Sequence, residues 1–238
     1  MSAQGLTVRA VGKTAPGGLT VILLHGFGAP GDDLVDLARY LEAPPGTRFL
    51  FPEAPLELSG LYGGARAWWM IDLEQLDRAL QLDRAQEIPP GLAPARRLVT
   101  GLLERVIAEG AGPIVLGGFS QGAMLSLDTA LHLDERAAAH LAGLVLMSGT
   151  PINGAAWAPR LGNPGPVTKL PILLSHGRAD PLLAFSAAQR LRDQLRAAGA
   201  AVDWVEFDGG HEIPPTVLTG ASRVLHAAAE RSAPETSP

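Results

Sequence analysis

The sequence predicts an α/β fold with a mostly parallel central sheet and helices on both of its faces. Apolar runs of strand length alternate along the chain with longer segments that have helical length or spacing. These apolar runs are continuous and do not alternate with polar residues, which is typical of strands buried on both faces. We find no internal repeat and no linker, so we expect a single domain over residues 1–231 and a disordered tail over 232–238.

The expected strands are short apolar runs, most of them bounded by Gly or Pro, over residues 6–11 at an edge, 19–24, 48–51, 114–116, 141–147, 171–175 and 202–207. The expected helices cover residues 31–41, 93–109, 123–131, 185–198 and 214–231. A long loop is expected over 149–170, because four prolines and four glycines fall within it. Residues 53–67 also have the composition of a loop, and residues 72–90 match no clear element.

Composition and charge narrow the class of function. The chain of 238 residues is 47% hydrophobic, which is normal for a globular enzyme. The formal net charge is −5 and no basic run occurs, so nucleic acid and an anionic membrane surface are not expected partners. The absence of cysteine excludes disulfides and thiolate catalysis. Neither a secretory signal nor an apolar run of about 18 residues is visible, so the expected location is cytoplasmic.

Residues 118–122 read Gly-Phe-Ser-Gln-Gly and lie between an expected strand and an expected helix. A chain that turns sharply from strand to helix has no room for side chains two residues before and after the apex, so glycines are needed there. The turn lifts the Ser120 hydroxyl out of the sheet and directs the helix N-terminus towards the atom that Ser120 attacks. The pattern also fits an ordinary turn, so its assignment depends on partners for Ser120.

Two polar residues complete the order Ser–acid–His that is typical of one class of hydrolytic triad. Asp180 follows the expected strand 171–175, and His211 follows the strand 202–207. Because parallel strands end at the same edge of a sheet, Ser120, Asp180 and His211 are expected to meet there. A serine needs a base to take its proton, and the base needs an acid to orient it. The alternative roles are a helix cap for Asp180 and a turn histidine for His211.

The remaining histidines and acids fit a triad less well. His176 ends a strand but precedes the candidate acid, so a structural role is expected for it. Asp208 and Glu212 lie too close to His211 in sequence for the usual geometry. A metal site is not expected, because residue 215, where His-Glu-x-x-His needs its second histidine, is proline.

The loop over residues 25–28, His-Gly-Phe-Gly, follows an early strand and can supply a backbone N–H group to a developing oxyanion. We expect the two donors to be the N–H groups of Phe27 and Gln121.

The same loop permits a rival interpretation, as a dinucleotide-binding protein. Residues 26–31 have the spacing Gly-x-Gly-x-x-Gly, and Glu53 follows Gly31 by 22 residues, near the place of the acid that binds a ribose. Asp32 and Asp33 would repel a pyrophosphate, which makes this the weaker alternative.

Together these motifs resemble the phospholipase/carboxylesterase family of the α/β-hydrolase superfamily, which includes acyl-protein thioesterases. The resemblance covers about residues 21–214 and rests on the motifs at 24–28, 51–55, 67–69, 118–122, 176–181 and 209–212. It implies an α/β-hydrolase fold with little or no cap and a cofactor-free serine hydrolase of carboxylic esters or thioesters. The departures are Met70, where the family usually has aspartate, and residues 28–31, Gly-Ala-Pro-Gly, where it often has Gly-Asp-Thr-Gly.

We therefore expect a carboxylesterase for short- to medium-chain esters that forms an acyl-enzyme on Ser120. A lysophospholipase or acyl-protein thioesterase is the alternative, and a non-catalytic binding module is a remote one. The expected partner is a small-molecule ester, and the chain could be a monomer or a dimer. The expected acyl pocket consists of Leu61, Tyr62, Trp68, Trp69 and Met70, with core packing as the alternative role.

Overall fold

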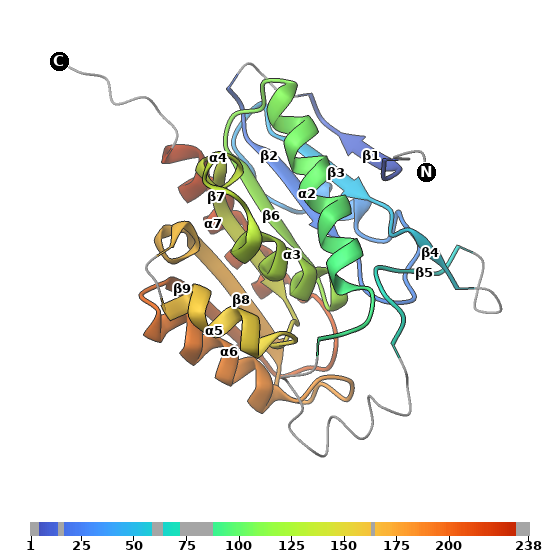
Figure 1. The fold of residues 1–238 in the computed structure, drawn as a ribbon, viewed down its shortest axis with the longest axis vertical. Helices are drawn as coiled ribbons and strands as arrows, with labels where there is room; N and C mark the ends of the chain where they lie inside the picture. Colours follow the sequence, from blue (N-terminus) through green and yellow to red (C-terminus); the bar gives the residue numbers. More distant parts are fainter. Residues whose placement is uncertain (1–4, 14–16, 59–63, 72–87, 163–164, 232–238) are drawn as a thin grey trace.

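The computed structural model describes residues 5–13, 17–58, 64–71, 88–162 and 165–231, which build a seven-stranded sheet with helices on both faces (Figure 1). The strand order is β1-β3-β2-β6-β7-β8-β9. Every neighbouring pair is parallel except β1 and β3, which are antiparallel at one edge. The mostly parallel sheet expected from the sequence is confirmed.

The strands of this sheet are β1 (Val8–Val11), β2 (Thr20–Leu24), β3 (Arg48–Pro52), β6 (Ile114–Phe119), β7 (Leu141–Met147), β8 (Pro171–Gly177) and β9 (Ala201–Phe207). Strands β4 (Leu56–Glu57) and β5 (Arg66–Ala67) form a separate two-stranded sheet. The helices are α2 (Leu92–Ala108), α3 (Gln121–His132), α4 (Glu135–Ala139), α5 (Gly154–Gly162), α6 (Phe185–Ala197) and α7 (Pro215–Glu230). Two short 3₁₀ helices are η1 (Val35–Arg39) and η2 (Pro166–Lys169).

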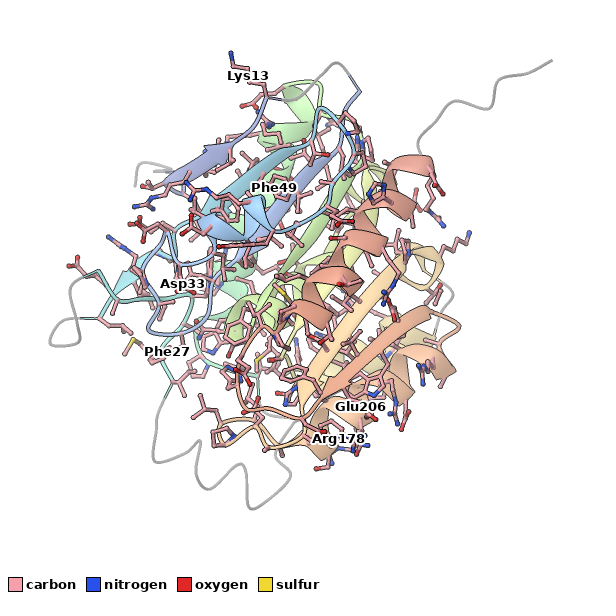
Figure 2. The ribbon with its side chains drawn as sticks, turned by 180° about the vertical axis from the view of Figure 1, so that it is seen from behind. Lys13, Phe27, Asp33, Phe49, Arg178 and Glu206 are labelled. Carbon is pink, nitrogen blue, oxygen red and sulfur yellow. The ribbon has the colours of Figure 1, made fainter. Side chains whose placement is uncertain are left out.

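The central strands are buried on both faces because successive side chains point into two separate apolar layers. On one face, Leu24 and Leu116 pack with apolar side chains of α2, α3, α5 and α6. On the other face, Leu23 and Val115 pack with those of α7 (Figures 1 and 2). This double burial explains why the strands read as continuous apolar runs. Within the described ranges, no helix has the length and apolar content needed to cross a bilayer.

The helix expected over residues 31–41 was a wrong prediction, because only the short 3₁₀ helix η1 forms there. A Cβ atom on Gly31 would lie 2.4 Å from Cγ of Glu53, so the chain is fixed by a close tertiary contact where a helix would begin. The segment continues through i→i+3 hydrogen bonds, such as Val35 N–H to Asp32 O and Leu37 N–H to Leu34 O. The spacing of the apolar residues is that of an α-helix, but the contact at Gly31 and the i→i+3 hydrogen bonds produce turns and a short 3₁₀ helix instead.

The loop expected over residues 149–170 was also a wrong prediction, because α5 and η2 lie within it. Trp157 of α5 is buried, and its indole N–H donates to Asp128 Oδ1 at 2.8 Å. The burial of Trp157 and its bond to Asp128 stabilise α5, although the prolines of this segment predicted a loop. The expected tail 232–238 and residues 72–87 of the unmatched stretch 72–90 lie outside the described residues.

Candidate functional site

Ser120 lies at the apex of a tight turn between β6 and α3. Its backbone has φ +54° and ψ −117°, a conformation that residues other than glycine rarely adopt. A Cβ atom would lie 2.4 Å from the carbonyl oxygen of Leu24 if placed on Gly118, and 2.0 Å if placed on Gly122. The two glycines are therefore needed where the sequence pattern predicts them. The turn leaves Ser120 only partly buried, at the N-terminus of α3.

Asp180 and His211 are brought together at the carboxyl ends of β8 and β9. His211 Nδ1 lies 2.6 Å from Asp180 Oδ2. The other carboxylate oxygen, Oδ1, accepts hydrogen bonds from the N–H groups of Leu182 at 2.8 Å and Leu183 at 2.9 Å. The Asp180 side chain is fully buried, whereas the His211 side chain is 12% exposed. The acid is thus enclosed, and the imidazole reaches the surface of the site.

Asp180 is ionised in this arrangement. Burial alone would raise the pKa of its carboxyl group, but hydrogen bonds from His176, His211 and the amides of Leu183 and Leu182 outweigh burial and hold that pKa well below its usual range. An ionised carboxylate can only accept hydrogen bonds, so the hydrogen between the two side chains lies on His211 Nδ1. The other ring nitrogen, Nε2, is then free to accept a proton.

The two rival acids have other partners. Asp208 is almost fully exposed and pairs with Arg178 at 3.6 Å. Glu212 accepts a hydrogen bond from the N–H group of Gly210. Of the three acids near His211 in sequence or space, it is therefore Asp180 that lies against the imidazole.

His211 is also placed next to the serine turn. Its ring centroid lies 4.7 Å from that of Phe119, the residue before Ser120, with the two rings tilted by 46°. Because β6, β8 and β9 are parallel members of one sheet, the loops that carry Ser120, Asp180 and His211 leave the same edge.

The loop after β2 lies against Ser120 and is fixed by two aromatic side chains. A Cβ atom on Gly26 would lie 3.4 Å from Ser120 Cβ. The His25 ring donates from Nδ1 to Gly26 O at 2.8 Å and accepts the Ala54 N–H at Nε2, which defines its neutral tautomer. Burial lowers the pKa of His25, in agreement with that neutral state. The Trp68 indole N–H donates to His25 O at 3.0 Å.

Phe27, the expected oxyanion donor, follows Gly26 in this loop and packs against a small apolar cluster of Leu58, Ala65 and Ala67. The loop is held to β5 by the bond from Gly28 N–H to Arg66 O, at 2.8 Å. A loop fixed at both ends can present its N–H groups without reorganisation.

The Gln121 side chain has a role that the sequence reasoning missed. Its Oε1 accepts the Trp68 N–H and its Nε2 donates to Trp69 O, both at 2.9 Å. The first residue of α3 thus ties the nucleophile turn to the two tryptophans. The adjacency of Gln to the serine and the presence of a Trp-Trp pair were both visible in the sequence, but nothing in their spacing showed the contact.

Of the residues expected to form the acyl pocket, Trp68 and Trp69 are 2% and 3% exposed and belong to the main apolar core. Met70 is 58% exposed, directly after them. Leu61 and Tyr62 lie outside the described residues. The packing of the tryptophans agrees with the alternative core role, and the pocket stays a prediction.

The geometry does not fit a dinucleotide at residues 26–31. The Glu53 carboxylate is bound by Arg9 at 2.9 Å and by Arg66 at 2.6 Å, so it is not available to a ribose. Gly31 packs against Glu53 and starts no α-helix. The N-terminal amides that would bind a pyrophosphate are therefore not arranged there.

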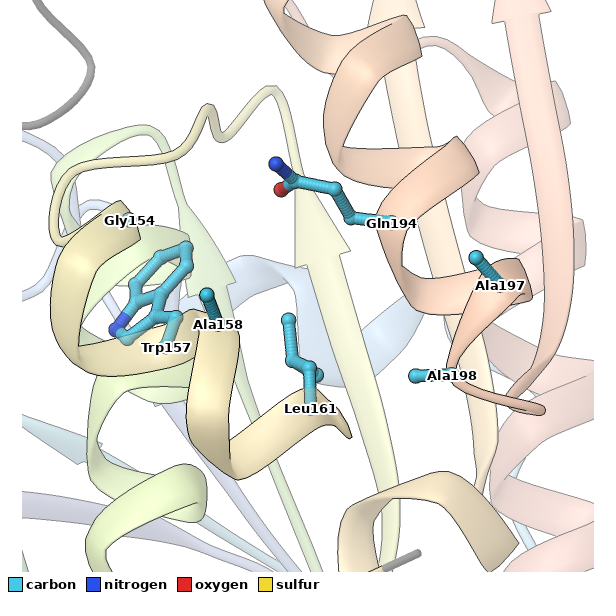
Figure 3. Close-up of a pocket in the computed structure, with 7 residues that line it drawn as sticks. All are labelled: Gly154, Trp157, Ala158, Leu161, Gln194, Ala197 and Ala198. Carbon is cyan, nitrogen blue, oxygen red and sulfur yellow. The ribbon is translucent and has the colours of Figure 1, made fainter. Parts of the chain in front are cut away.

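A separate pocket of about 340 Å³ lies between α5 and α6 (Figure 3). It is lined by Gly154, Trp157, Ala158, Leu161, Gln194, Ala197 and Ala198. Ala197 and Ala198 precede the amino end of β9, whereas His211 follows its carboxyl end. The pocket is thus distinct from the candidate site.

Three comparisons relate the chain to known proteins. A sequence model of the phospholipase/carboxylesterase family matches residues 8–228. An acyl-protein thioesterase 1 of Eremothecium gossypii is 30% identical over 239 residues, covering 95% of this chain and 96% of that protein. One of Neurospora crassa is 28% identical over 199 residues, covering 81% and 79%.

Solved structures have the same fold. The crystal structure of esterase PE8 is 28% identical, with a TM-score of 0.74 over 93% of this chain and 98% of that one. The Zea mays acyl-protein thioesterase 2 has a TM-score of 0.72 over 94% and 99%, and at 24% identity this likeness concerns the fold alone.

Proposed function

Because the chain belongs to the phospholipase/carboxylesterase family of α/β-hydrolases, we propose that it cleaves carboxylic esters through an acyl-enzyme on Ser120. The observation that carries the proposal is the 2.6 Å hydrogen bond between His211 Nδ1 and Asp180 Oδ2, at the same sheet edge as the strained Ser120 turn. A strained serine beside an oriented imidazole is the arrangement that nucleophilic catalysis needs.

In the proposed reaction, His211 Nε2 takes the hydroxyl proton as Ser120 Oγ attacks the ester carbonyl carbon. The N–H groups of Phe27 and Gln121 stabilise the oxyanion, and the N-terminus of α3 adds a favourable dipole. His211 gives the proton to the leaving alcohol, which departs and leaves an acyl-enzyme. A water molecule, deprotonated by His211, then attacks the acyl carbon. The bond to Ser120 Oγ breaks, His211 returns the proton to Oγ, and the carboxylic acid leaves.

The pH dependence follows from the two protonation states. Hydrolysis needs a base that can take the Ser120 proton, so kcat/KM should fall towards acid pH. Asp180 adds no second inflection near pH 4, because its pKa is held well below the usual range. The pKa of Asp180 is lower in the folded protein than in the unfolded chain. Ionised Asp180 therefore stabilises the fold fully above its pKa in the unfolded chain, and this stabilisation is lost as the pH falls towards the lower pKa of the folded state. Initial rates from pH 4 to 9 check this, and a rate that stays constant down to pH 4 would contradict it.

The acyl group is proposed to be short to medium in length. We expect turnover of p-nitrophenyl acetate and butyrate to exceed that of the palmitate, with each rate measured against Ser120→Ala. The relatives named acyl-protein thioesterases favour the alternative of thioesters of acylated proteins as substrates. Turnover that persists undiminished on the palmitate would favour that alternative over a small-ester carboxylesterase. The cytoplasmic location and the oligomeric state stay predictions.

A further inference from the structure

His176 is the second histidine at Asp180, and the proposed reaction gives it no part. It lies in β8 with its side chain fully buried. Its Nε2 is 3.0 Å from the carbonyl oxygen of Leu183 and 3.2 Å from Asp180 Oδ2. Both neighbours only accept hydrogen bonds, since Asp180 is ionised, so Nε2 carries a hydrogen and shares it between them.

This contact completes the set of donors around Asp180. Oδ1 is held by two backbone amides, and Oδ2 by His211 and His176. The His211 donor comes from the loop after β9, whereas His176 lies within β8, which pairs with β9 at this position. His176 is therefore the donor to Oδ2 that the sheet itself holds in place, and it limits rotation of the carboxylate about its Cβ–Cγ bond.

The His176 ring is itself fixed by packing. The Phe185 ring lies 6.2 Å from it with a tilt of 52°, and the Arg178 guanidinium lies over the Phe185 ring. Arg178 pairs with Glu206 at the surface (Figure 2). It also pairs with Asp208. Asp180 is the ionisable group that contacts His176 directly, and it also binds His211. The ring cannot easily turn its Nε2 away from Asp180.

A purely structural role does not explain a histidine here. Its Nδ1 is buried with no hydrogen-bond partner among the described residues. Leucine would occupy a similar volume without that unpaired nitrogen, which costs free energy. Leucine could not provide the Nε2–H contacts with Asp180 Oδ2 and Leu183 O, and of these the contact with Asp180 reaches the triad.

We propose that His176 is a positioning residue whose Nε2–H holds the Asp180 carboxylate in the orientation that receives His211. The proposal rests on the proposed function, because it assigns His176 a role in the same triad. Loss of the donor lets Oδ2 move relative to His211 Nδ1, which misaligns the base with Ser120. Such a misalignment slows the chemical steps and leaves binding of the ester unchanged.

The test compares three substitutions at this position. His176→Leu removes the donor, His176→Gln places an amide N–H near the original Nε2, and His176→Asn has an amide that is too short to reach it. We expect kcat of His176→Leu and His176→Asn to fall about 10- to 100-fold with KM within about twofold of wild type. His176→Gln should recover kcat to within about fivefold of wild type.

Two controls separate this role from a loss of stability. Ser175→Ala changes the neighbouring buried residue, and Leu174→Ala opens a cavity on the face of β8 that carries His176. Thermal unfolding of every variant is measured beside its kinetics. We expect Leu174→Ala to lower the Tm while its folded form keeps nearly the wild-type kcat, because it leaves the triad in place.

Wild-type kcat in His176→Leu, or a His176→Gln no faster than His176→Asn, would overturn the positioning role. If His176→Leu does not fold, the comparison of kcat between His176→Gln and His176→Asn tests the positioning role. An inactive wild-type protein would instead contradict the proposed function, so the two failures are distinguishable.

Discussion

Ser120→Ala is expected to lower kcat for ester hydrolysis by about five to six orders of magnitude while the protein stays folded. The substitution removes the atom that attacks the carbonyl, and the remaining turnover comes from the oxyanion donors and from substrate binding. Ser120 is partly exposed, and its side chain caps no backbone amide of α3. Alanine tolerates the positive φ about as well as serine does, so the free energy of unfolding should change little.

The matched control for this variant is Ser126→Ala on the same helix. Ser126 is buried, and its hydroxyl donates to Gly122 O at 2.8 Å, within α3. We expect this control to lose about 1 kcal/mol of stability and to keep its activity. Steady-state hydrolysis of a p-nitrophenyl ester and thermal unfolding measure both quantities. Equal losses of activity in the two variants would show that Ser120 has no special role.

Asp180→Asn is expected to lower kcat by about 10⁴ with little change in fold. The amides of Leu182 and Leu183 require an acceptor, so the amide oxygen of the new side chain takes the place of Oδ1. Its NH₂ group then faces His211 Nδ1 and donates to it, while the His176 Nε2–H keeps the carbonyl oxygen of Leu183 as its acceptor. The remaining hydrogen of a neutral His211 moves to Nε2, the atom that must accept the proton of Ser120, and the imidazole is held in the wrong tautomer.

The control for this variant is Asp208→Asn, which changes the exposed rival acid. We expect its kcat/KM to stay within about twofold of wild type, because its carboxylate pairs with Arg178 at the surface. If Asp208→Asn lost as much activity as Asp180→Asn, the assignment of Asp180 as the orienting acid would be wrong. Both variants are assayed at the same pH, together with the wild-type protein.

The triad candidates could be found from the sequence because each depends on local order along the chain. Ser120 lies between two glycines that the turn requires, and Asp180 and His211 each follow a strand of the parallel sheet. In a parallel sheet this order alone brings the three loops to one edge. The candidate catalytic residues could therefore be predicted because their positions depend on strand ends and on a tight turn.

The contacts that support the candidate site could not be predicted from the order of residues along the chain. The Gln121 side chain reaches the tryptophans 52 and 53 residues away in sequence, and no spacing rule encodes such a pair. The sequence predicted a structural role for His176, but its distance to Asp180 depends on how the loop after β8 folds back. The expected helix over 31–41 failed for a related reason, because Glu53, which follows β3, constrains the backbone at Gly31.

The central claim is that Ser120 carries the acyl group during turnover, and trapping that intermediate tests it most directly. The protein is mixed with excess p-nitrophenyl butyrate, quenched in acid within the first turnovers, and digested for peptide mass mapping. The account predicts a burst of p-nitrophenol close to one equivalent and a butyryl adduct on the peptide that contains Ser120, both absent from Ser120→Ala. Full turnover with the adduct on another residue, or an undiminished burst in Ser120→Ala, would contradict it.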